Sequence, residues 1–239
     1  MPEIVDGYRT PRADRVAWGL PDVVVAWIVG TVASIVAVAP FLDPKVPQSR
    51  QVGALLVALL AQSAGTAATL VWIARRKGLG SLAADFGLRL RVRDWWWITL
   101  GVGVAIGASL MVAPITEVAH LHKSTQDVVR VFKHAQGLEL PFFALGVAVV
   151  APIVEELLFR GALLRSLMRR TNPTVAVFTS ALIFALIHVV GDTGTAYYVP
   201  AFLMLGLISG WRAVTTRNLS QSIYLHIGFN LLATILILI

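Results

Sequence analysis

The stretch PFFALGVAVVAPIVEELLFRGALL, residues 141–164, decides the class of this protein. It is apolar along its length except for three charged side chains, those of Glu155, Glu156 and Arg160. A helix of about 20 such residues crosses a hydrocarbon core of roughly 30 Å. An ionisable side chain at mid-bilayer costs about 2.5–3.5 kcal/mol on insertion scales, so each of the three needs a structural or functional reason. The stretch therefore predicts a membrane-spanning helix with a polar site.

The rest of the chain has the same character. Of its 239 residues, 57% are hydrophobic and 14% are charged, and the mean hydropathy is +0.76, which excludes an ordinary water-soluble domain. We assign the net charge of +7 to membrane topology and expect no nucleic-acid partner. The absence of cysteine excludes disulfides and thiolate nucleophiles. We predict an all-α polytopic transmembrane helix bundle with about seven spans, at residues 20–42, 52–74, 95–115, 141–164, 174–191, 195–212 and 219–238.

The distribution of Lys and Arg predicts the orientation of this bundle. Fifteen of the 20 basic residues fall in the N-tail, in the connections after spans two, four and six, or in the last turns of spans four and six, and five fall in the other connections. The positive-inside rule then places the N-terminus in the cytoplasm and the C-terminus outside a plasma or inner membrane. We expect one domain with four parts: a cytoplasmic N-tail (1–19), three transmembrane helices (20–115), an external segment with a surface helix (116–140) and a four-helix core (141–239).

Glycine pairs predict close contacts between spans. Gly103 and Gly107, like Gly206 and Gly210, have the four-residue spacing that lets two helix backbones approach closely. Helix packing is the expected role of all four.

The three charged residues of span four differ in the partners that the helix offers them. On a helical wheel, Arg160 lies about 40° from Glu156, so these two form an i,i+4 pair that can neutralise itself. Glu155 points to another side of the helix, next to Phe159. It is therefore the carboxylate available to a partner on another helix.

Two later spans each supply polar partners. Glu155 and His188 are equally distant from the centre of the RRTNPT connection (169–174), so an antiparallel hairpin brings them level. His188 shares a helix face with Phe184. His226 and Asn230 are again i,i+4, in a span without Lys, Arg, Asp or Glu. Each of these spans also has a simpler, structural interpretation. His188 would then be a buried histidine with a hydrogen bond, and His226 and Asn230 would form polar contacts that join helices.

Three motifs in this order resemble a known family. EELLFR (155–160) fits Glu-Glu-x-x-x-Arg, FALIH (184–188) fits Phe-x-x-x-His, and HIGFN (226–230) fits His-x-x-x-Asn. Together they resemble the CPBP family, which includes CAAX prenyl-processing endopeptidases and bacteriocin-processing or immunity proteins. The resemblance covers residues 140–235, and the first three spans match no family that we can name.

The resemblance implies a helical intramembrane protease without a covalent intermediate. Glu155 and His188 would activate a water molecule, His226 and Asn230 would stabilise the oxyanion, and Arg160 would hold Glu156. We assign Phe159 and Phe184 to substrate binding. We expect no cofactor; in the alternative, Glu155, His188 and His226 would hold Zn²⁺ with a fourth position for water, although the chain has no HExxH motif.

Two other functions remain possible from the sequence. A proton-coupled transporter would also place Glu, His and Arg inside a bundle, but the chain shows no inverted repeat. A non-catalytic immunity or scaffolding protein would use the same polar residues for binding. For the peptidase we expect the bilayer and membrane-associated or CAAX-like peptides as partners, and the oligomeric state is left open.

Overall fold

The computed structural model describes residues 16–43, 45–46, 51–118, 135, 137–190 and 193–238. Most of the predicted N-tail and the predicted surface helix of segment 116–140 lie outside these residues. The described residues contain helices and no strand, which confirms the all-α prediction. The α-helices are α2 (Leu20–Val38), α3 (Val52–Lys77), α4 (Leu82–Phe86), α5 (Trp97–Val118), α7 (Glu139–Leu145), α8 (Ala151–Glu156), α9 (Leu164–Met168), α10 (Pro173–Ile187), α11 (Val199–Thr216) and α12 (Ser220–Leu238).

Shorter elements connect these helices. Three are 3₁₀ turns: η2 (Ala39–Phe41), η4 (Val92–Asp94) and η7 (Thr193–Tyr198). Two are π-helical segments, η5 (Gly146–Val150) and η6 (Leu157–Leu163), which join α7, α8 and α9 into one continuous helix. This continuous helix contains the predicted span four.

Five segments of the described chain are long and apolar enough to cross a membrane: Leu20–Phe41, Val52–Lys77, Val92–Pro114, Glu139–Met168 and Ala196–Thr216. The protein is thus a multi-pass membrane protein. The other two predicted spans are also helical, as α10 and α12, but α10 has only 15 residues. It ends at Ile187 with His188 as its C-cap, short of the predicted end at 191. Seven crossings therefore stay a prediction.

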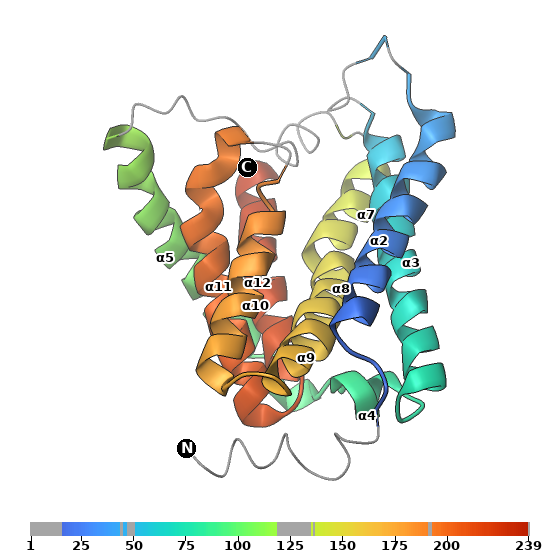
Figure 1. Cartoon of the computed structure of the whole chain (residues 1–239). Coiled ribbons are helices and arrows are strands. Elements are labelled where there is room, and N and C mark those ends of the chain that lie inside the picture. The colour runs from blue at the N-terminus through green and yellow to red at the C-terminus, as the bar shows by residue number, and fades with distance from the viewer. Residues whose placement is uncertain are drawn as a thin grey trace.

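The α7–α9 helix divides the bundle into two parts (Figure 1). Helices α2 and α3 pack on one side of it, and α5, α10, α11 and α12 form the other part. The helices alternate in direction, so the basic residues at the ends of α3, α9 and α11 come to the same end of the bundle (Figure 1). The predicted topology requires these basic residues to lie on one side of the membrane, as they do here. That this side is the cytoplasmic one stays a prediction.

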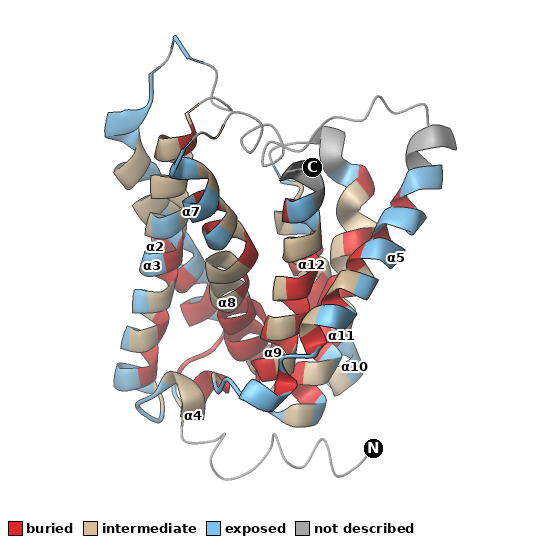
Figure 2. Ribbon diagram, turned by 180° about the vertical axis from the view of Figure 1, so that it is seen from behind, coloured by how far each residue is buried: buried red, intermediate tan, exposed pale blue. Residues whose placement is uncertain are grey.

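Buried residues gather where α8 and α9 lie among their neighbours, and the outer faces of α2 and α5 are exposed (Figure 2). The exposed residues of α2 are mostly large and apolar, among them Val25, Ile28, Val32 and Ile35. Such a surface suits contact with lipid.

Glycine lets the α2–α3 pair approach closely. A Cβ at Gly30 would collide with the Thr66 hydroxyl, and one at Gly65 would press on the backbone at Gly30. Because neither glycine has a side chain, the two helices can lie in direct contact.

The glycine predictions hold for one pair and fail for the other. Gly206 and Gly210 lie against Ala181 and Val177 of α10, as close packing requires. Among the described residues, nothing lies within 4 Å of a Cβ at Gly103 or Gly107. The close contact of α5 falls instead at Gly101, against the backbone of Leu225 on α12, so the prediction selected the wrong face of α5.

Candidate active site

Two π-helical segments bracket the two adjacent glutamates. In η5 the backbone N–H of Ala151 donates to Gly146 O, five residues earlier. If this five-residue pattern continued, the N–H of residue 152 would donate to Val147 O. Residue 152 is proline and has no N–H, so Val147 O receives no backbone hydrogen bond in this pattern. Asn230 of α12 fills the gap, because its Nδ2 donates to Val147 O at 3.0 Å. Asn230 thereby joins α12 to the central helix next to the site.

Glu156 and Arg160 form the predicted i,i+4 pair at the centre of the bundle. Arg160 Nη1 lies 3.3 Å from Glu156 Oε1, and both side chains are 0% exposed. His226 Nδ1 lies 3.0 Å from the same carboxylate oxygen and is also buried. Glu156 thus faces one cation and one imidazole, which offset the cost of burying a carboxylate.

Aromatic rings surround the Arg160 guanidinium. Its central carbon lies 4.3 Å from the Phe184 ring centroid and 6.0 Å from that of Phe159, within the range of cation–π attraction. The Phe184 ring also contacts the imidazoles of His188 and His226, at centroid distances of 4.3 and 5.6 Å. Phe184 therefore contacts the buried cation and both imidazoles.

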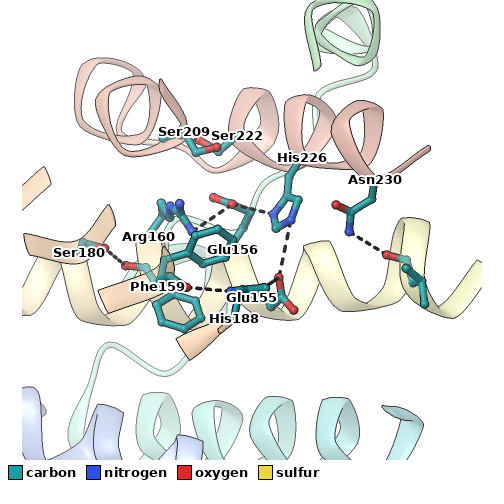
Figure 3. A network of polar contacts seen from close by, with 12 residues as sticks. Glu155, Glu156, Phe159, Arg160, Ser180, His188, Ser209, Ser222, His226 and Asn230 are labelled. Carbon is teal, nitrogen blue, oxygen red and sulfur yellow. Dashed lines mark hydrogen bonds and ion pairs between the residues drawn. The ribbon is translucent and has the colours of Figure 1, made fainter. Parts of the chain in front are cut away.

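Glu155 has a different environment from its neighbour. Its side chain is 30% exposed, and its Oε2 lies 3.7 Å from His188 Nε2 and 3.6 Å from His226 Nε2. The helical hairpin does bring Glu155 and His188 level, as predicted. Figure 3 shows both imidazoles turned toward this one carboxylate.

On each imidazole, the partner of Nδ1 determines which ring nitrogen carries the proton and therefore what Nε2 offers to Glu155. His188 Nδ1 lies 2.7 Å from Phe184 O, a carbonyl in the last turn of α10. A carbonyl only accepts, so this Nδ1 carries a proton. His226 Nδ1 faces the ion-paired Glu156 carboxylate and is protonated for the same reason. In their neutral forms, both rings therefore direct an Nε2 lone pair toward Glu155.

A cavity of about 440 Å³ adjoins Glu155 and His188. Of the polar cluster, Glu155 and His188 line the cavity, whereas Glu156, Arg160 and His226 do not. Its walls come from α2, α3, α7, α8, η6 and α10. The lining residues are Trp27, Ser34, Leu55, Ala58, Leu59, Gln62, Ser63, Thr66, Phe143, Ala151, Val154, Glu155, Leu158, Phe159, Ile187 and His188.

The structure brings five of the six predicted catalytic residues into one polar cluster, while Asn230 donates to a backbone carbonyl at its edge. Of the two predicted substrate-binding residues, Phe159 lines the cavity, whereas Phe184 is fully buried behind it. The sequence reasoning missed Gln62, although a glutamine within an apolar span is a detectable signal.

The zinc alternative depends on Glu155, His188 and His226. The donor types suit zinc, since two Nε2 lone pairs and a carboxylate converge. Across the described ranges, however, no group of three or more His, Asp or Glu side chains has the arrangement of a metal site.

Comparisons with known proteins agree with the motifs. Residues 137–232 match the family described as Type II CAAX prenyl endopeptidase Rce1-like. The chain is 35% identical over 83 residues to the UPF0177 protein YxdF of Lactococcus lactis subsp. lactis (strain IL1403), an alignment that covers 35% of this chain and 43% of that relative. The chain thus spans less than half the length of this curated relative. No solved structure matches.

Proposed function

We propose that this membrane protein, whose residues 137–232 carry the Rce1-like CAAX prenyl endopeptidase match, hydrolyses peptide bonds of membrane-associated substrates with a water molecule that Glu155 activates. One observation carries the proposal: the partly exposed Glu155 carboxylate lies at a cavity, with two imidazole Nε2 atoms within 3.7 Å of one of its oxygens. A base, a polarising partner and room for a substrate thus occur together.

The tautomers support a water molecule at this position. A carboxylate and a neutral imidazole both accept hydrogen bonds, and neither Nε2 is within 3.5 Å of Glu155. A water molecule has two donors, so it can donate one hydrogen to Glu155 and the other to His188 Nε2. Held in this way, its oxygen directs a lone pair into the cavity.

Hydrolysis then follows in two steps. Glu155 takes a proton from the water as the oxygen bonds to the carbonyl carbon of the substrate, which becomes a tetrahedral oxyanion. Glu155 next passes this proton to the leaving nitrogen as the C–N bond breaks, giving a carboxylic acid and an amine. The free carboxylate is restored, and no covalent enzyme intermediate forms.

His226 and Asn230 are the proposed oxyanion donors. A proton on His226 Nε2 would make this nitrogen a donor to the oxyanion, while Nδ1 stays against Glu156. Asn230 uses one N–H for Val147 O and keeps the other. Arg160 acts through Glu156, by fixing the carboxylate that orients His226.

The test uses purified protein in liposomes with quenched fluorescent peptides, including CAAX-like sequences. We expect Glu155→Gln and His188→Ala to reduce kcat/KM by about 10²–10⁴-fold. Glu139→Gln, at the start of α7 and away from the cluster, is the matched control and should leave kcat/KM unchanged. Equal cleavage by wild type and both site variants, or no cleavage by folded wild type, would favour the non-catalytic binding role.

Chelation distinguishes the zinc alternative, in which a bound ion would polarise the water and substrate carbonyl. Cleavage that survives EDTA supports activation of the water by Glu155 and His188 without a metal ion. Cleavage that EDTA abolishes and added Zn²⁺ restores would assign Glu155, His188 and His226 as ligands.

A further inference from the structure

Gln62 is a polar residue in the middle of α3, a span that also contains Ser63, Thr66 and Thr69, and its side chain is exposed. Within the described ranges, that side chain has no hydrogen-bond partner. An amide without a partner is unfavourable in hydrocarbon, so its position needs an explanation. Gln62 lies on the cavity that Glu155 and His188 also line.

The cavity runs between two helix faces. Its lining residues on α3 have the three- and four-residue spacing that places them on one face: Leu55, Ala58, Leu59, Gln62, Ser63 and Thr66. On α8 and the adjoining turn, the face is formed by Ala151, Val154, Glu155 and Leu158. Figure 3 shows the α2–α3 pair on the side of α8 opposite α12. Gln62 thus belongs to a wall that faces the catalytic helix and comes from outside the family match.

The register of the two helices gives the separation of Gln62 from Glu155. Helices α3 and α7 run in the same direction (Figure 1), with Gly53 against Glu139 and Leu59 against Gly146. Continued at this offset, Gln62 is level with residue 148 or 149, six or seven residues before Glu155. At 1.5 Å per helical residue, Gln62 lies about 10 Å from Glu155 along the helix axis. An extended peptide covers about three residues in this distance.

We propose that Gln62 binds the substrate main chain about three residues from the scissile bond, an inference that rests on the proposed peptidase function. A peptide must be extended to be cleaved, and in hydrocarbon its N–H and C=O groups then lack partners. The amide of Gln62 offers one acceptor and two donors, which match a peptide group as a neighbouring strand does. The apolar residues of the wall, including Trp27 and Phe143, suit apolar substrate side chains. The ligand class is therefore an extended apolar peptide segment.

The first test measures kinetics with a ten-residue quenched peptide of Leu, Val and Ala. Gln62→Leu keeps a similar volume and removes the amide, so we expect KM to rise about three- to tenfold, with kcat nearly unchanged. Gln62→Asn keeps an amide on a shorter side chain, so its KM should lie between those of wild type and Gln62→Leu. Thr69→Val is the control, because Thr69 lies on the same helix, donates to Gly65 O and does not line the cavity. An unchanged KM in folded Gln62→Leu would overturn the proposal.

The second test uses ester-substituted peptides, in which one N–H at a time is replaced by oxygen. An ester about three residues from the scissile bond should raise KM for wild type and leave Gln62→Leu unaffected, while esters elsewhere should affect both proteins equally. Equal effects at every position would refute a main-chain contact at Gln62.

Binding separates this proposal from the peptidase function itself. In a Glu155→Gln background, the same peptide carrying fluorescein should bind about three- to tenfold more weakly when Gln62→Leu is added. This result would support the Gln62 contact even if wild type cleaved nothing, in which case only the peptidase proposal would fail. Equal Kd values would overturn the Gln62 contact, whatever the cleavage assay showed.

Discussion

Asn230 has two separable roles, and Pro152 provides the means to separate them. The hydrogen bond from Asn230 to Val147 O serves a carbonyl that has no backbone donor because residue 152 is proline. Asn230→Ala leaves this carbonyl unpaired, which should lower the free energy of unfolding by about 1 kcal/mol. In a Pro152→Ala background, the backbone N–H of residue 152 can donate to Val147 O. Loss of the Asn230 hydrogen bond should then have almost no effect on the free energy of unfolding.

The cycle of wild type, the two single variants and the double variant isolates this coupling, since the cavity left by the shorter side chain cancels. Unfolding would be followed by SDS titration in mixed micelles. We expect a coupling of about 1 kcal/mol between positions 152 and 230. If Asn230→Ala lowered the free energy of unfolding equally with Pro152 and with Ala at this position, Asn230 would not be replacing the N–H that proline lacks.

Activity should respond differently from stability in the same four proteins. If Asn230 also donates to the oxyanion, Asn230→Ala reduces kcat by about 10²–10³-fold, and Pro152→Ala does not rescue it. A rescue of both stability and kcat by Pro152→Ala would instead assign Asn230 a positioning role only.

Two further predictions follow from packing at the centre of the bundle. Glu156→Gln or Arg160→Met leaves one member of a fully buried ion pair, so each should destabilise the protein by about 3–5 kcal/mol, and the double variant should lose less than the sum; additive losses in SDS titration would contradict the pairing. Gly101→Ala should cost about 1–3 kcal/mol, because its Cβ meets the backbone of Leu225, whereas Gly103→Ala meets open space and should be close to neutral. Similar melting temperatures for the two glycine variants would argue against the observed contact of α5 with α12.

The sequence determined the class of the fold and most of the site. Apolar stretches of bilayer length predict helices, because every backbone group in hydrocarbon must be paired within its own segment. The i,i+4 spacing of Glu156 and Arg160 placed them together, since contacts within one helix follow from its period. The tight turn between spans four and five likewise brought Glu155 level with His188.

Only the tertiary structure decided how separate helices share these groups. The spacing of His226 on α12 could not show that its ring reaches both glutamates, because this depends on how α12 crosses α8. The glycine pair of α5 was assigned to packing, but close contact falls at Gly101 because the rotation of a helix about its axis is set by its neighbours. The wall that faces Glu155 comes from α3, about 90 residues earlier in the chain, and no local spacing encodes such a contact.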